Sequence, residues 1–211
     1  EAALTPTGAW CQDAWVSTAM LSSVSERLKF LVAFRPGLTS PFLAAQMAGT
    51  FQNLSGGRLL LNVVTGGESH EQRMYGDHLD KEERYERCDE FLHLVRALWS
   101  GETLTHEGAH YRLDDAVLAQ IPDPLPEIYF GGSSSAAGRV AAKHVDVYLT
   151  WGEPPAAYGR RSSGSPSWRP TRGVSCASAS GCTPSPATPP RRPGPRRTGF
   201  SPASATSRSP R

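Results

Sequence analysis

The sequence predicts an α/β protein whose parallel strands form a (β/α)8 TIM barrel. Strand-like apolar runs alternate with amphipathic helical segments over the first 157 residues, and repeated β–α units of this kind produce parallel strands joined by right-handed crossovers. A doubly wound sheet fits the same alternation, but no Gly-x-Gly-x-x-Gly follows the first strand. The distinctive polar motifs instead follow the predicted strands directly, at the edge where barrels place their active sites.

The first part of the series contains three strands and two helices. Leu4–Gly8 has the character of a strand tail, and Asp13–Glu26 carries apolar residues at helical spacing. Leu28–Phe34 is a strong strand. A Ser-Pro pair supplies an N-cap and a first helical residue for a helix over 40–54. The run 58–64 is nearly continuous in apolar β-formers, which is typical of a strand buried on both faces.

The second part repeats the pattern with one insertion. Apolar residues on one face predict a long helix over 81–100, and the glycine that follows is a typical stop. Alternation over 103–113 predicts a hairpin. A strand at 127–130, a helix over 134–144 and a strand at 146–151 complete the series.

The end of the 58–64 strand carries the most informative polar residues. Asn62 interrupts the apolar run, and a polar amide in such a strand needs a hydrogen-bond partner from the protein or from a ligand. Thr65 and the two glycines after it allow the backbone to come close to a bound molecule. An ordinary turn after a core strand is the alternative interpretation of Thr-Gly-Gly.

Charge and proline divide the chain into two parts. The formal net charge is only +2, yet residues 1–157 hold 12 Lys/Arg and 20 Asp/Glu, a net of −8. Residues 158–211 hold 10 arginines, no acidic residue and 10 of the 18 prolines. This asymmetry predicts a domain at 1–157 followed by a basic, disordered tail rich in Pro, Arg and Ser.

The four cysteines contain no Cys-x-x-Cys pair, and no four ligands are grouped at the spacing of a zinc site. We therefore expect no metal. The sequence also shows no signal peptide and no long apolar span, so we expect a cytoplasmic protein without a membrane anchor.

Six motifs in unbroken order resemble one family. Taken together they resemble the flavin-dependent alkanesulfonate monooxygenases of the bacterial-luciferase-like superfamily. The motifs are Pro6-Thr-Gly-Ala-Trp-Cys-Gln-Asp-Ala-Trp15, Phe30-Leu-Val-Ala-Phe-Arg-Pro36, Asn62-Val-Val-Thr-Gly66, Glu83-Arg-Tyr85, Tyr129-Phe-Gly-Gly-Ser-Ser134 and Tyr148-Leu-Thr-Trp-Gly-Glu-Pro-Pro155.

The resemblance implies a TIM-barrel enzyme of sulfur acquisition. Such an enzyme uses reduced FMN, supplied by a separate NAD(P)H-dependent FMN reductase, and O₂ to convert alkanesulfonates to aldehyde and sulfite. It further implies a homo-oligomer in the intact family. A deazaflavin-dependent oxidoreductase of the same superfamily is the nearest alternative.

The resemblance also implies site residues. Asn62 and Thr65 match strand-end positions that line the flavin site, and Arg84 and Tyr85 match a pair that contacts flavin. Glu71 is expected to line the same site. For Arg84, the alternative is a surface ion pair with nearby glutamates.

Two further positions complete the expected site. Gly132, Ser133 and Ser134 precede a helix, where free backbone N–H groups and hydroxyls can meet an anion. We assign the FMN phosphate there, with Ser133 as the main contact, although Ser134 could simply cap the helix. Cys11 matches a cysteine near the active site of the family, while a lone cysteine is more often a small buried hydrophobe.

The resemblance stops at about residue 157. The family's first strand and its last strands have no counterpart in the sequence, so we expect a partial barrel that is not a stable, active monomer. Residues 158–211 have the composition of a GC-rich coding sequence read in a wrong frame, and we hypothesise a frameshift, which the coding DNA would test. A non-catalytic barrel fragment with a basic nucleic-acid-binding tail is the alternative from another class; we expect no specific nucleic acid partner.

Overall fold

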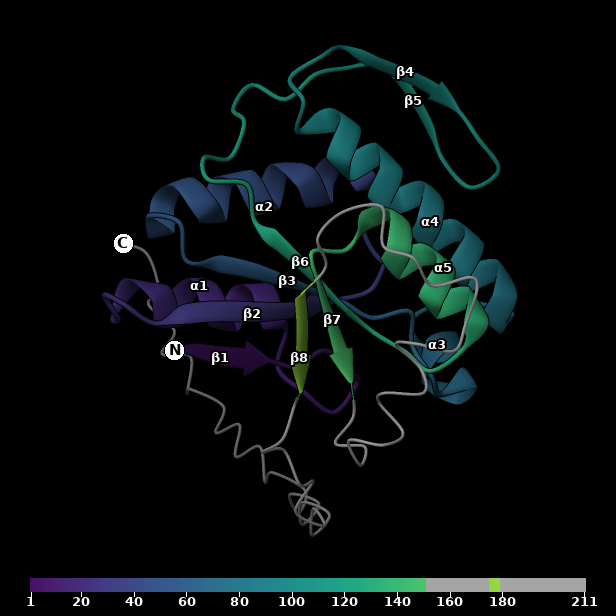
Figure 1. Ribbon diagram of the computed structural model, residues 1–211, viewed down its shortest axis with the longest axis horizontal. Coiled ribbons are helices and arrows are strands. Elements are labelled where there is room, and N and C mark those ends of the chain that lie inside the picture. The colour runs from purple at the N-terminus through teal and green to yellow at the C-terminus, as the bar shows by residue number, and fades with distance from the viewer. Residues whose placement is uncertain (151–174, 179–211) are drawn as a thin grey trace, which may run out of the picture. The chain divides into compact units, whose positions relative to one another are not determined.

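A computed structural model describes residues 1–150 and 175–178 of the chain. Its centre is a six-stranded sheet in which all five neighbouring pairs are parallel (Figure 1). The strands, in their order across the sheet, are β1 (Ala2–Thr5), β2 (Lys29–Phe34), β3 (Leu59–Val63), β6 (Glu127–Gly131), β7 (Val147–Thr150) and β8 (Ser175–Ser178). A separate antiparallel hairpin consists of β4 (Leu104–Glu107) and β5 (Arg112–Ala116), as predicted.

The order of the strands decides between the two α/β architectures. Every strand of the sheet lies beside the strand that follows it in the chain, apart from the inserted hairpin. A doubly wound sheet reverses its order at a switch point, whereas a barrel does not. The predicted partial TIM barrel is therefore confirmed.

Five helices join the described strands: α1 (Ala14–Ser23), α2 (Pro41–Ser55), α3 (Ser69–Met74), α4 (Lys81–Leu98) and α5 (Ser135–His144). Four of them lie where the sequence predicts a helix. The capping residues explain this agreement, because the side chains of Asp13, Ser40 and Ser134 each accept a hydrogen bond from a backbone N–H of the first turn. Asp80 and Glu83 form a capping box at the start of α4.

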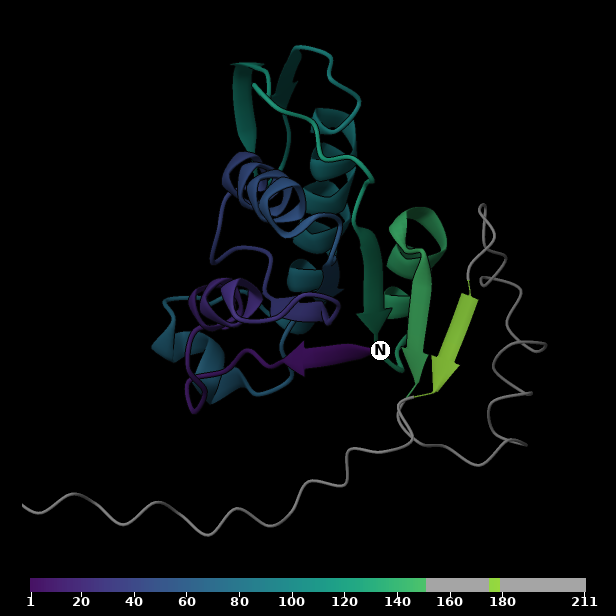
Figure 2. The ribbon, with the colours of Figure 1, turned by 90° about the vertical axis from the view of Figure 1, so that its left-hand side faces the viewer.

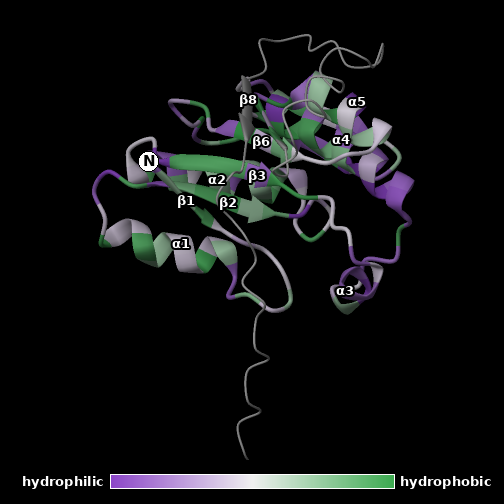
Figure 3. Ribbon diagram, turned by 60° about the horizontal axis from the view of Figure 1, so that its bottom comes forward, coloured by the Kyte–Doolittle hydropathy of each residue, from purple (hydrophilic) through white to green (hydrophobic). Residues whose placement is uncertain are grey.

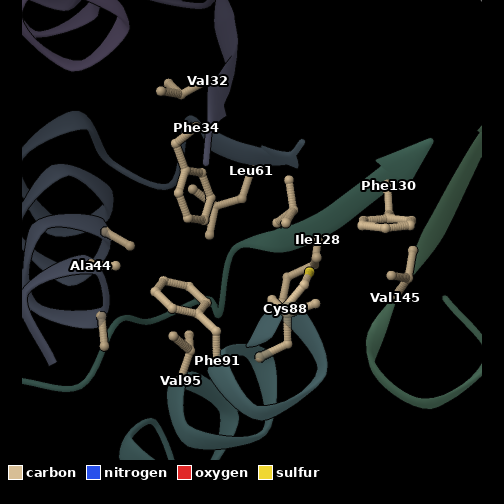
Figure 4. Close-up of a cluster of buried hydrophobic side chains, with 14 of the residues drawn as sticks. Val32, Phe34, Ala44, Leu61, Cys88, Phe91, Val95, Ile128, Phe130 and Val145 are labelled. Atoms are coloured by element: carbon tan, nitrogen blue, oxygen red, sulfur yellow. The ribbon is translucent and has the colours of Figure 1, made fainter. Parts of the chain in front are cut away.

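The main hydrophobic core lies between the helices and one face of the sheet. Phe30, Val32 and Phe34 of β2 contribute to it, as do the alternate residues of β3 and β6 (Figure 4). Phe91 of α4 packs against Phe34, with ring centroids 5.9 Å apart. Figure 3 shows that hydrophilic and hydrophobic residues alternate along α4 and α5, as expected for helices with one face toward the core.

The opposite face of the sheet carries the remaining alternate side chains. We call it the inner face, formed by Ala33, Asn62, Tyr129 and Val147. These four residues are neighbours across β2, β3, β6 and β7 in register. The inner face corresponds to the interior of a barrel, so Asn62 lies on the side of the sheet where a barrel encloses its side chains.

The tail contributes one described element. Ser175–Ser178 forms β8, parallel to β7, within the segment expected to be disordered. The unpaired backbone groups of β7 provide the template for this pairing. The rest of 158–211 lies outside the described residues, as does Trp151–Pro155, so the predicted tail and its frameshift remain predictions. No helix among the described residues is long and apolar enough to cross a membrane.

Candidate active site

The loops that follow the strands meet along one edge of the sheet. Parallel strands end at the same edge, and Figure 2 shows β6, β7 and β8 pointing the same way. The loops after β1, β3 and β6 carry most of the site residues predicted from the sequence. The exceptions are Asn62 within β3, Glu71 on α3, and Arg84 and Tyr85 at the start of α4.

Asn62 lies on the inner face with its amide available. Its strand neighbours are Ala33 and Tyr129, and the residue is half-buried. Within residues 1–150 and 175–178, its side chain makes no hydrogen bond. A half-buried amide without a protein partner is suited to a ligand or to water.

Glu71 connects the loops that follow three successive strands. It lies on α3, after β3, and its Oε1 accepts a hydrogen bond of 2.8 Å from the backbone N–H of Ala9, in the loop after β1. Its Oε2 forms a 2.7 Å ion pair with Nη2 of Arg35, at the end of β2. Both carboxylate oxygens therefore already bind protein groups. Arg35 is a site residue that the sequence analysis missed, although it belongs to the motif Phe30–Pro36.

Cys11 lies in the same loop as Ala9. The backbone N–H of Cys11 donates to the carbonyl of Gly8 at 3.0 Å, which closes a tight turn. The residue is exposed, unlike the buried hydrophobe of the alternative interpretation. Cys88 of α4 is that kind of cysteine: it is completely buried, and burial raises the pKa of its thiol.

Arg84 is buried rather than paired at the surface. It is 5 % exposed, and its guanidinium donates to the carbonyl oxygens of Leu79 at 2.6 Å and of Gly66 at 3.4 Å. No ion pair joins it to a glutamate in the described part of the chain, so the surface ion pair considered as an alternative is excluded there. Its Nε is buried without a described partner. Arg84 thus holds the loop after β3 from the α4 side.

Gln72 packs against the same loop at Gly66. It is 1 % exposed, and a Cβ placed on Gly66 would lie 1.8 Å from its Nε2. Gly66 has φ +83°, so this contact exists because residue 66 has no side chain. The Nε2 of Gln72, like the Nε of Arg84, lacks a partner among the described residues.

Tyr85 and Gly132 meet at the end of β6. The Tyr85 hydroxyl lies 3.3 Å from the position of a Cβ on Gly132, and the Gly132 carbonyl accepts a hydrogen bond from Tyr148. The Ser134 hydroxyl accepts from the backbone N–H of Ala137 at 3.2 Å, so it caps α5. Ser133 is exposed.

The predicted site residues therefore form two groups. Cys11 and Glu71 lie together with Arg35, while Tyr85 lies with Gly132 at the next strand ends. Thr65 lies in the loop after β3, and Arg84 supports this loop by donating a hydrogen bond to the carbonyl of Gly66.

The sequence was compared with models of known families. The model described as "Luciferase-like monooxygenase" matches residues 1–163. The chain belongs to the luciferase-like monooxygenase family. This assignment confirms the superfamily that the six motifs indicated, while the alkanesulfonate specificity remains a proposal.

Solved structures of the family show the same fold. EDTA monooxygenase from Chelativorans sp. BNC1 has a TM-score of 0.68 and 21 % identity, over 75 % of this chain and 44 % of that chain. Riboflavin lyase has a TM-score of 0.67 and 21 % identity, over 72 % and 39 %. An F420-dependent secondary alcohol dehydrogenase has a TM-score of 0.64 and 20 % identity, over 80 % and 54 %. This chain therefore spans roughly half, or less, of each relative.

The side chains at the strand ends fit a flavin of this family in chemical terms. Asn62 offers an amide on the inner face, and the Nε atoms of Arg35 and Arg84 are buried donors without described partners. Two glycines and an exposed Ser133 precede α5, where free N–H groups favour a phosphate. Among the described residues, no three His, Cys, Asp or Glu side chains are placed to hold a metal.

Proposed function

We propose that the chain is part of a flavin-dependent monooxygenase that uses reduced FMN and O₂ to convert alkanesulfonates to an aldehyde and sulfite. The observation that carries the proposal is the open amide of Asn62 on the inner face, directly before the Thr65–Gly67 loop. The family match and the order of the six motifs support it. A separate NAD(P)H-dependent FMN reductase would supply the reduced cofactor, and the intact enzyme would be a homo-oligomer.

The residues of this chain would hold the cofactor in two places. Asn62, Thr65 and Tyr85 would contact the ring system, and Gly132, Ser133 and Ser134 would receive the phosphate. Because the Ser134 hydroxyl already caps α5, Ser133 and the backbone N–H groups are the better phosphate donors. Reduced FMN, when bound, supplies the electrons that activate O₂.

The other residues of the proposed site would help to exclude water and to fix the position of the loops. Reduced flavin must be shielded from water if its electrons are to reach the substrate. Gln72 and Arg84 hold the loop at Gly66 in place, so Arg84 would support the flavin site through the loop that it binds. Cys11, on an exposed turn, would lie beside the flavin, and Glu71 would act at the same edge.

A titration tests the cofactor proposal. Reduced FMN is added anaerobically to the full chain, and tryptophan fluorescence is followed. We expect saturable binding that Asn62→Leu weakens about tenfold, the scale of one lost hydrogen bond to a buried partner. Asn53→Leu is the matched control, because Asn53 is exposed on α2. Equal affinities in the two variants would reject the role of Asn62.

A second assay tests the reaction. Sulfite release from octanesulfonate is measured with the chain, FMN, a flavin reductase and NADPH. Sulfite release would support the sulfonate substrate, and flavin binding without sulfite release would show that this chain does not perform the reaction alone, while leaving the cofactor proposal intact.

A deazaflavin-dependent oxidoreductase is the second candidate. It is favoured by the structural likeness to an F420-dependent secondary alcohol dehydrogenase, at a TM-score of 0.64. A parallel titration with reduced F420 distinguishes the two, because the true cofactor should bind at least about tenfold more tightly than the other. The alternative of a basic nucleic-acid-binding tail concerns residues outside the described part of the chain.

A further inference from the structure

Three loops that are far apart in the sequence converge on one carboxylate. Ala9 is 62 residues from Glu71 and Arg35 is 36 residues from it, yet both donate to its side chain. Ala9 precedes Cys11 by two residues, in a turn closed by the hydrogen bond from the Cys11 N–H to the Gly8 carbonyl. The side chain of Glu71 is therefore the described contact that links the Cys11 turn to the ends of β2 and β3.

The turn lies so close to the carboxylate that a side chain at residue 8 would press against it. A Cβ on Gly8 would lie 3.0 Å from Glu71 Oε1, and its next neighbours, Arg35 Nη2 and Cys11 Sγ, would both be 3.9 Å away. A separation of 3.9 Å is an ordinary contact, so Glu71 alone limits the size of residue 8. The Cys11 Sγ is 3.9 Å from the same Cβ position, so it lies within about 7 Å of the Glu71 Oε1.

The buried contacts of Glu71 favour its ionised carboxylate. Arg35 is 6 % exposed and Glu71 is 9 % exposed. Burial on its own raises the pKa of Glu71, but the Ala9 N–H and the Arg35 guanidinium outweigh it and hold the pKa below its usual value. Arg35 Nε and Nη1 have no described partner, so Glu71 supplies the one described carboxylate for this buried charge.

We propose that Glu71 is a positioning residue, which fixes the Cys11 turn against the ends of β2 and β3 so that the thiol is presented at the mouth of the site. The significance of the turn rests on the proposed function, in which Cys11 lies beside the flavin. The positioning itself depends only on the contacts of Glu71. Glu71 then acts through the turn, and not by touching the cofactor, because both of its oxygens already accept hydrogen bonds from the protein.

Hydrogen exchange on the full chain measures the positioning directly. In Glu71→Ala the Ala9 N–H loses its acceptor, and we expect its exchange to become about tenfold faster, the scale of one lost hydrogen bond in a local opening. Alkylation of Cys11 by iodoacetamide, followed by peptide mass spectrometry, should accelerate in the same variant, because the turn is released and a nearby negative charge is removed. Glu26→Ala, at an exposed glutamate outside this network, is the control and should change neither rate.

A double-mutant cycle tests whether Glu71 itself is the contact. Gly8→Ala introduces a Cβ that meets only Glu71 Oε1 closely, so we expect faster Ala9 exchange and faster Cys11 alkylation. In the Glu71→Ala background the same Gly8→Ala substitution should have no further effect, because the obstruction is gone. Additive effects of the two substitutions, or unchanged Ala9 exchange in Glu71→Ala, would overturn the proposal.

Cys88 reports whether each variant is folded. It is a completely buried residue of α4, and it should stay unreactive while the alkylation of Cys11 accelerates. If Glu71→Ala unfolds the chain and exposes Cys88, Gly8→Ala decides alone: faster Cys11 alkylation with Cys88 protected supports the proposal, and an unchanged rate rejects it. None of these measurements needs flavin, so the positioning role can stand even if the flavin titration fails.

Discussion

Arg87 of α4 binds both carboxylate oxygens of Asp77. Its Nη1 donates to Oδ1 at 3.2 Å and its Nη2 to Oδ2 at 2.5 Å, and the two side chains are only 12 % and 4 % exposed. A Cβ on Gly37, in the loop after β2, would lie 2.2 Å from the Arg87 guanidinium carbon. The pair therefore braces the loop after β2, the segment after α3 and α4. It also borders a pocket of about 440 Å³ that His78 and His110 help to line.

Replacing Asp77 by Asn should destabilise the chain strongly. The substitution keeps the shape but leaves the Arg87 charge buried without a carboxylate, which costs about 3–5 kcal/mol in the free energy of unfolding. Asp114→Asn is the matched control: Asp114 pairs with Arg112 at 3.5 Å, but its side chain is 72 % exposed, and such pairs contribute about 1 kcal/mol or less. Urea unfolding measures both, and similar losses for the two variants would contradict the prediction.

The Asp77 pair should also make stability depend on pH. Burial raises the pKa of Asp77, but the hydrogen bonds and charge of Arg87 outweigh burial and hold the pKa of this carboxyl in the folded chain below its usual value. A carboxyl with a lowered folded pKa stabilises above its unfolded pKa, and the contribution disappears as pH falls through the folded pKa. We expect this part of the stability to be complete above about pH 5 and to decline below about pH 4.

The measurement is the free energy of unfolding from pH 7 to pH 2.5. Asp77→Asn should flatten the acid limb of the curve relative to the unmodified chain, while Asp114→Asn should leave it nearly unchanged. An acid limb of the same steepness in Asp77→Asn would show that other carboxylates account for it.

Gly66→Ala should damage the loop after β3. Residue 66 has φ +83°, where an alanine costs about 1–2 kcal/mol, and the new Cβ would overlap the Gln72 amide at 1.8 Å. We expect a loss of about 2–5 kcal/mol in the free energy of unfolding, with overpacking included. Gly67→Ala is the control, since nothing lies within 4 Å of its Cβ position. Thermal unfolding compares the two, and equal midpoints would refute the overlap.

Ser133 and Ser134 should respond differently to alanine. Ser134→Ala removes the cap of α5 and should cost about 1 kcal/mol of stability. Ser133→Ala removes an exposed hydroxyl and should leave stability unchanged, while it weakens reduced FMN binding by about tenfold if Ser133 donates to the phosphate. Thermal unfolding and the flavin titration together separate the two roles. A Ser133→Ala variant with unchanged flavin affinity would assign the phosphate to the backbone alone.

The strands and helices were predictable because their signals are local. Helix α2 begins at Pro41, directly after its N-cap Ser40. It ends before Gly56, which has φ +69°. Helix α3 was missed because its six residues, of which five are polar, show no helical periodicity. Its main signal is a buried polar residue, Gln72, and burial is not visible in a sequence.

The site was less predictable, because its contacts join distant residues. Motif resemblance placed Glu71 and Arg84 at the flavin, but it did not predict their partners within the protein. Glu71 accepts hydrogen bonds from Ala9 and Arg35. Arg84 donates to the carbonyls of Leu79 and Gly66. A charged side chain in a motif has several possible partners, and only the fold decides among them. Ser134 was the opposite case, since an N-cap depends on residues within three positions and was weighed from sequence.

The sequential order of the parallel strands has a consequence for synthesis of the chain. Each strand of the sheet from β2 to β7 pairs with the sheet strand made before it, and only the hairpin intervenes, between β3 and β6. A nascent chain can therefore extend its sheet unit by unit as it leaves the ribosome, without waiting for a distant segment. Ribosome-bound intermediates halted after α2 and after α5 should accordingly contain two and then four paired strands of the sheet.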